Sequence, residues 1–233
     1  MKIRPARKSD KEEILSFCVN TFSWGDYINR VWNYWLNSGR LLIVEDNDRK
    51  IAMSHVAVCP NNKSVWLEGL RVHPTNRRSR IATKLLAKMM QYGARKGATQ
   101  ANAIVDLPNI ALQRMMEKIG FEAVSRWAYY SIQGRIRRSK SAARLASGTE
   151  LQEIWEYLQQ SETYRLSAKK YVKSWHWHFL DRKALRGFIK EKRVVVSGLP
   201  VMGVAIINRN GYWDRTNILQ IVYLDAASSG LLG

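Results

Sequence analysis

The sequence predicts an α/β fold in which helices cover a sheet. Segments rich in apolar residues, such as "RLLIVED", "IAMSHVAV" and "SVWLEGLRV", have the pattern of strands. The last of them is followed by Ile81, Leu85, Leu86 and Met89, which recur at the spacing of an amphipathic helix. Because strands and helices alternate along the chain, we expect a layered α/β sandwich.

The first elements follow from local signals. "KIRPA" predicts a short strand, and Asp10 with Glu13 three residues later predicts a capping box before a helix through Ile14 and Cys18. An aromatic-rich segment, "FSWGDYINRVWNYWL", comes next. "RLLIVED" and "IAMSHVAV" flank the turn sequence "NDRK", which predicts a hairpin.

The later elements are marked mainly by caps. The helix that begins near Ile81 should close at Gly93 or Gly97, and "ANAIVDL" predicts the next strand. Asn109 is expected to cap the helix "IALQRMMEKIG", which should end at Gly120. "FEAVSRWAYYSIQG" then predicts one or two further strands.

A basic segment divides the chain. "RIRRSKSAARLAS" carries five basic residues and no acidic one, which is typical of a solvated linker. We expect a domain over 1–134, a basic linker over 135–149 and a smaller C-terminal α/β unit over 150–233. In that last unit, "RVVVSGLPVMGVAIINR" and "ILQIVYLDA" repeat the pattern of "RLLIVEDNDRKIAMSHVAV" and "VWLEGLRV". The copy stops before a loop and helix like those of the first, which predicts an incomplete half-repeat.

Composition limits the functional classes. The 233 residues carry a formal charge of +19, which favours contact with polyanions without naming one. Cys18 and Cys59 are too few and too far apart for a disulfide scaffold or a zinc site. No secretory leader opens the sequence and no apolar run has membrane-spanning length, so we expect a cytoplasmic protein.

The stretch "LEGLRVHPTNRRSRIATKLL" joins a strand to a helix through a basic loop. Free N–H groups at a helix start, together with the helix dipole, bind phosphate, and Arg77, Arg78 and Arg80 add positive charge there. Glycine usually supplies the left-handed conformation in such loops, so Arg80 costs about 1 kcal/mol if that conformation is needed. The alternative interpretation is a solvated basic loop.

"EGLRVHPTNRRSRIATKLL" resembles the acyl-CoA-binding core of the GNAT superfamily of N-acetyltransferases. That family's loop pattern has Gln or Arg, two residues, Gly, one residue, and Gly or Ala. "NIALQRMMEKIGF" is similar to the family's later segment, in which Asn precedes a helix ending in Gly-Phe. The resemblance covers roughly residues 2–133. It implies a GNAT-like mixed central sheet flanked by helices, acetyl-CoA as co-substrate, and acetyl transfer to a primary amine. The echo in the last unit suggests a tandem arrangement.

The resemblance also implies site residues. Main-chain groups of one strand end would pair with the pantetheine arm, and the loop with Asn109 would hold the rest of the cofactor. Glu68, on the same strand, lies where many relatives carry a catalytic carboxylate, and is therefore the candidate general base. Its alternatives are an exposed strand residue or an ion-pair partner for Arg71. The cofactor-binding residues predicted in this way are Leu70, Arg71, Val72, Arg77, Arg78, Ser79, Arg80, Ile81, Ala82 and Asn109.

The sequence indicates the binding site for the acceptor amine and the proton donor less clearly than the cofactor site. Trp24, Asp26 and Tyr27 form an aromatic and acidic group that suits a cationic amine, although the tryptophans of this segment are also good packing residues. The family's proton-donating Tyr falls on Met116, which donates no proton. Tyr129 or Tyr130 could replace it, but as strand aromatics they are predicted to lie in the core.

Two alternative functions remain open at this stage. Arg80 and Met116 would suit a catalytically weak acyl-CoA-binding protein, and the charge with "RIRRSK" would suit a nucleic-acid-associated one. No metal is expected, because His55 and His73 have no second ligand at metal spacing. "WHWH" (175–178) is predicted to lie in a helix-like stretch with its aromatic residues in the core.

Overall fold

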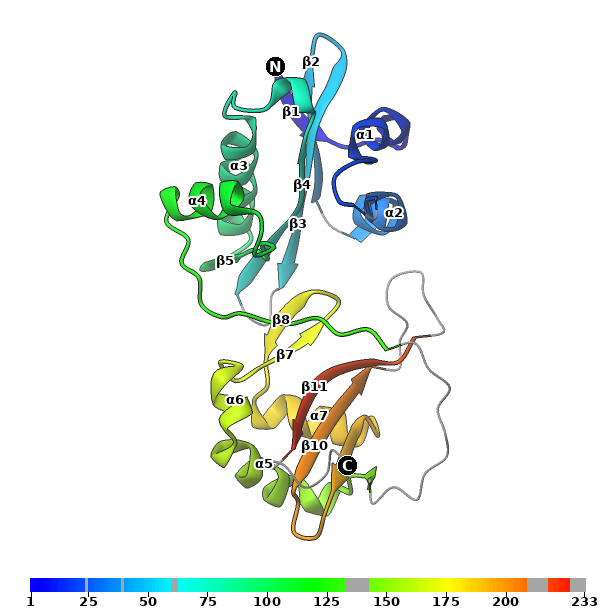
Figure 1. The fold of residues 1–233 in the computed structure, drawn as a ribbon, viewed down its shortest axis with the longest axis vertical. Coiled ribbons are helices and arrows are strands. Elements are labelled where there is room, and N and C mark those ends of the chain that lie inside the picture. Colours follow the sequence, from blue (N-terminus) through cyan, green and yellow to red (C-terminus); the bar gives the residue numbers. More distant parts are fainter. Residues whose placement is uncertain (24, 39, 60–62, 133–142, 209–217, 227–233) are drawn as a thin grey trace. The chain divides into compact units, whose positions relative to one another are not determined.

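The computed structural model describes residues 1–23, 25–38, 40–59, 63–132, 143–208 and 218–226. The chain divides into two compact units, Met1–Phe121 and Glu122–Gly233 (Figure 1). No helix in the described ranges is both long and apolar enough to cross a membrane.

The first unit is built on a five-stranded sheet in the order β1-β2-β3-β4-β5. The first four strands run antiparallel to their neighbours, and β5 pairs parallel to β4. The predicted "NDRK" hairpin is confirmed, with Asn47 and Asp48 at positive φ in the turn between β2 and β3. The strands are β1 (Lys2–Pro5), β2 (Arg40–Asp46), β3 (Arg49–Cys59), β4 (Ser64–Val72) and β5 (Gln100–Asn102).

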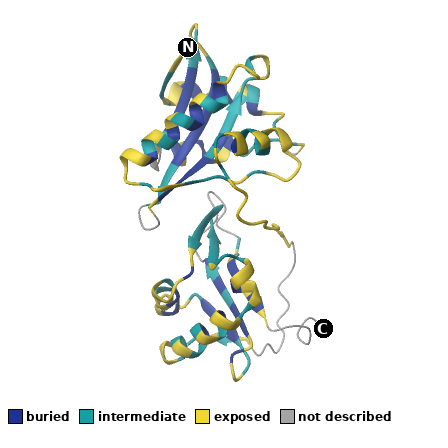
Figure 2. Cartoon of the chain, turned by 90° about the vertical axis from the view of Figure 1, so that its left-hand side faces the viewer, coloured by how far each residue is buried: buried dark blue, intermediate teal, exposed yellow. Residues whose placement is uncertain are grey.

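Helices cover both faces of this sheet, as Figure 1 shows: α1 and α2 lie on one side, α3 and α4 on the other. The bounds are α1 (Lys11–Cys18), α2 (Ile28–Ser38), α3 (Ile81–Arg95) and α4 (Ile110–Lys118). Strand residues such as Val44 and Val56 pack against Leu85 and Met89 of α3, all fully buried. Figure 2 shows the buried strands behind helices whose outer sides are exposed.

Glycine ends both helices of the second layer, as the sequence predicts. Gly97 and Gly120 have φ of 80° and 90° and follow α3 and α4. The amide of Phe121 donates to the carbonyl of Met116, which completes the expected glycine cap.

Three local predictions are wrong. Residues 122–132 form no strand, and Tyr129 and Tyr130 are 68% and 83% exposed, so they do not lie in a core. "WHWH" is not helical: β8 (His176–Phe179) pairs with β7 (Lys170–Lys173) after a turn at positive φ, and Phe179 is 50% exposed. The predicted capping box also differs, since the Asp10 carboxylate accepts the Arg7 amide while Glu13 accepts the Lys50 amide.

The second unit has a four-stranded sheet in the order β11-β10-β9-β6 and the separate two-stranded hairpin β7-β8. In Figure 1, α7 lies behind strands β10 and β11. Part of the predicted linker forms the strand β6, while residues 133–142 lie outside the described ones. The remaining elements are β6 (Arg144–Leu145), α5 (Leu151–Gln160), α6 (Glu162–Leu166), α7 (Arg182–Lys190), β9 (Val194–Ser197), β10 (Gly203–Asn208) and β11 (Gln220–Ala226).

The same pattern of polar contacts occurs inside each of the two units. Arg4 forks onto the Asp10 carboxylate at 2.7 and 2.8 Å, and Arg144 forks onto the Glu150 carboxylate at 2.8 and 2.6 Å with the same spacing in sequence. Three residues after each carboxylate, a glutamate of the following helix accepts a backbone amide from the next hairpin. The two amide bonds are Lys50 to Glu13 at 2.7 Å and Val201 to Glu153 at 2.8 Å.

One row of strand partners also matches between the two units. The row begins at an arginine of the first strand and continues through the two strands of the hairpin to the last strand. The two rows are Arg4–Ile43–Met53–Arg71 and Arg144–Val196–Val204–Asp225. We infer that residues 144–226 are a partial copy of the first unit, with the hairpin β7-β8 added between the copies of α1 and α2.

The close approach of Gly69 to Trp35 gives a test of the first unit. Gly69 has a φ of 65°, and a Cβ there would lie 2.3 Å from the Trp35 ring. We expect Gly69→Ala to lower the free energy of unfolding by about 2–4 kcal/mol, from backbone strain plus overpacking. Gly120→Ala is the matched control, because Gly120 also has positive φ but nothing within 4 Å. Urea denaturation measures both, and equal losses would contradict the packing argument.

Candidate functional site

The loop before α3 adopts the strained conformation that the sequence suggested. Arg80 is the N-cap residue of α3 with φ 60° and ψ 15°, in the left-handed region, and its side chain makes no capping bond. Arg78 also has positive φ, at 65°. The conformation that glycine would supply is therefore present, and an arginine adopts it at a cost of about 1 kcal/mol.

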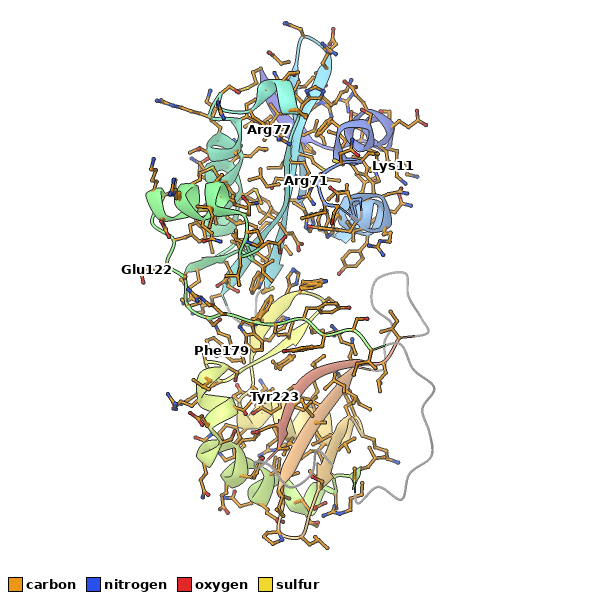
Figure 3. All side chains as sticks on the ribbon, viewed as in Figure 1. Lys11, Arg71, Arg77, Glu122, Phe179 and Tyr223 are labelled. Atoms are coloured by element: carbon orange, nitrogen blue, oxygen red, sulfur yellow. The ribbon has the colours of Figure 1, made fainter. Side chains whose placement is uncertain are left out.

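The start of α3 has the features of an anion site. The first amides of the helix have no carbonyl partner within it, and the helix dipole adds partial positive charge. Ile81 is 4% exposed and anchors the first turn in the core, whereas residues 77–80 are exposed. The Ser79 hydroxyl donates to the Asn76 carbonyl and closes the loop on itself. Figure 3 labels Arg77 at this loop.

The C-terminal half of strand β4 has no strand neighbour on one side among the described residues. The short strand β5 pairs only with Ser64, Val65 and Trp66. Among the described residues no strand pairs with that edge of β4 from Leu67 to Val72, so the backbone groups of residues 70–72 are placed where an extended ligand could pair with them.

A bulge on β4 arranges the side chains at this place. Met53 faces Arg71 and His55 faces Glu68, so β4 has one residue more than β3 between the two pairs. Gly69, at positive φ, lies within this bulge. The bulge therefore sets which side chains of β4 meet the residues of β3 and α2.

Glu68 meets His55 and not Arg71. Its carboxylate Oε1 lies 2.7 Å from His55 Nδ1, with side-chain exposures of 16% for Glu68 and 2% for His55. The Trp35 ring stacks on the imidazole at a centroid distance of 4.6 Å and an interplanar angle of 2°. From the sequence, His55 was assessed only as a metal ligand. Its pairing with Glu68 could not be predicted, because that pairing depends on the cross-strand register, which the bulge sets.

Arg71 instead binds Asp26. Its Nε and Nη2 donate to the two carboxylate oxygens at 2.7 and 3.1 Å, and the guanidinium lies 5.2 Å from the Phe22 and Tyr27 ring centres. Burial lowers the pKa of Arg71, but the hydrogen bonds to Asp26 and the electrostatic effects of Tyr27, Asp26 and Cys18 together leave that pKa raised. Asp26 is 5% exposed, so its carboxylate serves Arg71, whereas the sequence analysis placed it against a cationic acceptor. Figure 3 labels Arg71 on β4.

The thiol and phenol around this pair are held neutral. Burial raises the pKa of the Tyr27 hydroxyl, and it raises that of the Cys18 thiol to about 12. Trp32 and Trp35 are 1% and 2% exposed, which confirms them as packing residues. Trp24 lies outside the described residues.

The remaining predicted residues lie on α4 or in the second unit. Asn109 accepts the Leu112 amide at 3.1 Å, which confirms it as the cap of α4. Met116 is 5% exposed in the core and supplies no acid. Tyr129 and Tyr130 belong to the second unit.

The second unit lacks the histidine and glutamate. Ile206 stands two residues after Val204, as His55 follows Met53, and it pairs with Tyr223 across the sheet. Both are buried, at 0% and 5% exposure. No group of His, Cys, Asp and Glu side chains that could hold a metal ion occurs in the part of the chain that the structure describes.

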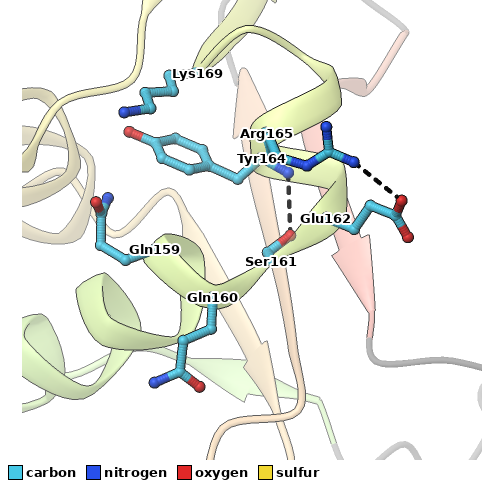
Figure 4. Close-up of a pocket in the computed structure, with 7 residues that line it drawn as sticks. All are labelled: Gln159, Gln160, Ser161, Glu162, Tyr164, Arg165 and Lys169. Atoms are coloured by element: carbon cyan, nitrogen blue, oxygen red, sulfur yellow. Dashed lines mark hydrogen bonds and ion pairs between the residues drawn. The ribbon is translucent and has the colours of Figure 1, made fainter.

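A cavity of about 510 Å³ opens in the second unit, at the end of α5 (Figure 4). Ser161 in its wall bonds the Asp225 carboxylate, which also accepts the Tyr223 hydroxyl at 3.2 Å. The lining combines amides, an exposed ion pair and a lysine with the Ser161 hydroxyl. The lining residues are Gln159, Gln160, Ser161, Glu162, Tyr164, Arg165 and Lys169.

Known proteins resemble the first unit. Residues 10–121 match the family model described as the acetyltransferase (GNAT) family. Aminoglycoside N(6′)-acetyltransferase type 1 of Salmonella typhimurium is 29% identical over 83 residues, which cover 36% of this chain and 57% of that protein. The match thus spans little more than half of that relative's length.

Solved structures give the same result for the fold. A transcriptional regulator from Bacillus halodurans C-125 is 16% identical, with 56% of this chain and 99% of that chain covered, at a TM-score of 0.51. An aminoglycoside N-acetyltransferase solved in complex with CoA is 19% identical, with 57% of this chain and 100% of that chain covered, at a TM-score of 0.47. The mixed sheet between two helical layers, the loop that opens α3 and the family match agree. Over residues 10–121, the first unit of this chain is similar to the GNAT family of acetyltransferases.

Proposed function

We propose that this protein transfers an acetyl group from acetyl-CoA to a primary amine by direct attack, without a covalent enzyme intermediate. One observation carries the proposal. Within residues 10–121, the C-terminal part of β4 has one edge with which no described strand pairs. This part of the strand leads from Glu68, whose side chain is 16% exposed, to the basic loop and the start of α3. This arrangement joins a base, an extended backbone edge and an anion site along one strand.

Each part of acetyl-CoA has a matching group in the first unit. The pyrophosphate suits the free amides of α3 and the side chains of Arg77, Arg78 and Arg80. The amide-rich pantetheine arm suits the edge of β4 at residues 70–72, where no described strand pairs and where the carbonyls of Leu70 and Val72 accept from Arg71 and Arg77. A backbone N–H of this segment would also stabilise the oxyanion that forms when the amine attacks the thioester.

Glu68 is the proposed general base. Most primary amines are protonated at neutral pH, so attack requires a group that takes the proton. Glu68 lies on the strand that would carry the thioester and is 16% exposed. The departing thiol has a pKa near 8.5, so it leaves tolerably as thiolate, which fits the absence of an acid at Met116.

The acceptor class is the least constrained part of the proposal. The Salmonella relative acts on aminoglycosides according to its name, so aminoglycosides are the first amines to screen. The segment before α2 presents aromatic rings, but Arg71 already neutralises its carboxylate. We therefore propose Glu68, and not Asp26, as the carboxylate that meets the acceptor amine.

The loop makes a direct prediction for cofactor binding. We expect Arg77→Ala combined with Arg78→Ala to weaken CoA binding on the order of tenfold or more, because charge-assisted bonds to phosphate are lost. Isothermal titration with CoA measures this. Lys88→Ala combined with Arg95→Ala removes the same charge from exposed positions further along α3 and should bind like the wild type. Equal weakening in both double variants would point to net charge and not to the loop.

The base makes a second prediction. We expect Glu68→Gln to lower kcat/KM for an accepted amine by about 100-fold or more, with CoA affinity unchanged, because Gln takes no proton. Thiol release from acetyl-CoA measures the rate. Glu117→Gln, an exposed carboxylate on α4, is the control. Full activity of Glu68→Gln would remove Glu68 from the reaction.

One observation favours a second candidate function, contact with single-stranded nucleic acid. In the second unit, Trp127, Tyr129 and Phe179 are 39%, 68% and 50% exposed, and Lys170 lies 5.5 Å from the Phe179 ring centre. Exposed rings beside lysines stack bases and neutralise phosphates. The formal net charge of +19 is also of the sign that attracts nucleic-acid phosphates.

We expect a fluorescent oligonucleotide to bind with an affinity that falls linearly with the logarithm of salt concentration. Combining Tyr129→Ala with Phe179→Ala should weaken binding several-fold, since stacking contributes about 1–3 kcal/mol per base. Tyr34→Ala, 61% exposed in the first unit, is the control. Affinity without salt dependence, or equal loss in the control, would refute this function.

A further inference from the structure

His55 occupies an unusual position for a histidine. Its ring lies flat against Trp35 and is 2% exposed, and its one described hydrogen bond joins Nδ1 to Glu68 Oε1 at 2.7 Å. The opposite ring nitrogen, Nε2, is buried without a hydrogen-bond partner among the described residues. The stacked tryptophan fixes the plane of the ring, and the hydrogen bond fixes its rotation.

These contacts orient the ring for one hydrogen bond. Nδ1 faces the Glu68 carboxylate, and Nε2 is buried without a hydrogen-bond partner among the described residues. A carboxylate oxygen accepts, so the bond requires a hydrogen on Nδ1, and His55 is the donor of the pair.

The second unit is an internal control for this pair. Ile206 takes the place of His55 and pairs with Tyr223 across the sheet, and both belong to the core of that unit. Buried polar pairs are commonly replaced by apolar residues at no loss of stability. This strand arrangement therefore does not need a histidine and a carboxylate at these positions, and their presence in the first unit calls for a role other than packing.

We propose that His55 is a positioning residue for the base: its Nδ1–H holds the Glu68 carboxylate ionised and aims its other oxygen at the acceptor amine. The inference rests on the proposed function, because it assigns His55 a role only if Glu68 takes the proton. A hydrogen bond to the charged form of a carboxylate favours that form. Without it, the Glu68 carboxylate would lose a donor that favours its charged form.

The other charged and titratable groups nearby stay in one form over the working pH range. Tyr27, Cys18 and Cys59 have pKa values raised by burial, and Arg71 has a raised pKa and is bound to Asp26. A change in the acid limb of the pH profile on altering His55 is thus assigned to Glu68.

Two substitutions of His55 separate positioning from packing. His55→Asn keeps a donor near the place of Nδ1, whereas His55→Ile installs the residue of the second unit and removes the donor. We expect His55→Ile to lower kcat about tenfold and to move the acid limb of kcat/KM upward by about 1 pH unit, because a base with a higher pKa is lost at higher pH. His55→Asn should keep the limb at its wild-type position and recover most of the rate. The KM for acetyl-CoA should stay unchanged in both.

The outcomes distinguish this inference from the proposed function. Full activity of Glu68→Gln would refute the base itself. Loss of activity in Glu68→Gln with an unmoved acid limb in His55→Ile would refute the role of His55 alone. Nitrogen-15 NMR of His55 needs no turnover: a hydrogen on Nδ1 is expected, and an Nε2–H tautomer would overturn the inference. Thermal unfolding of both variants identifies any loss of fold.

Discussion

The bulge on β4 at Gly69 is the constraint on which the site depends. It places Glu68 opposite His55 and Arg71 opposite Met53, although a regular ladder would shift one of these pairs by a residue. Trp35 presses against Gly69 so closely that a Cβ has no room, and it stacks on His55 with the same ring. One tryptophan of α2 therefore holds both the bulge and the histidine. Without the bulge, Glu68 would lie on the opposite face of the sheet.

The pattern of polar contacts shared by the two units separates what the fold requires from what the site requires. The forked arginine pair, Arg4–Asp10 or Arg144–Glu150, ties the first strand to the first helix in each unit. A glutamate one turn later then receives a hairpin amide in each. These contacts recur because they assemble strand, helix and hairpin. The histidine, the glutamate and the basic loop do not recur in the described part of the second unit, which supports the proposal that they serve the chemistry of the first.

Sequence patterns predicted the elements whose signals are local. The "NDRK" turn, the Asn109 cap and the glycine ends of α3 and α4 each depend on a few neighbouring residues, and all are present. Contacts between distant residues were not predictable. The pair Arg71–Asp26 and the pair His55–Glu68 depend on the bulge and on where α2 lies, which no local pattern encodes.

The wrong predictions have a related cause. The aromatic residues of 122–132 suit a strand, but a strand also needs a neighbour that supplies hydrogen bonds, and no strand among the described residues pairs with this segment. "WHWH" has apolar residues at a spacing that fits a helix or a strand. The positive φ of Ser174 and Trp175 turns the chain there and makes it a hairpin.

Arg80 shows how strain and charge combine in the candidate site. A residue whose only task was to cap α3 would be Ser, Asp, Asn or Gly, and Arg80 makes no capping bond. Its left-handed conformation costs about 1 kcal/mol that glycine would avoid. The folded state tolerates this cost because Ile81, the next residue, is anchored in the core. What arginine adds is a positive charge beside amides and a dipole that already favour an anion. A strained residue that neither caps nor packs is best explained by the ligand it attracts.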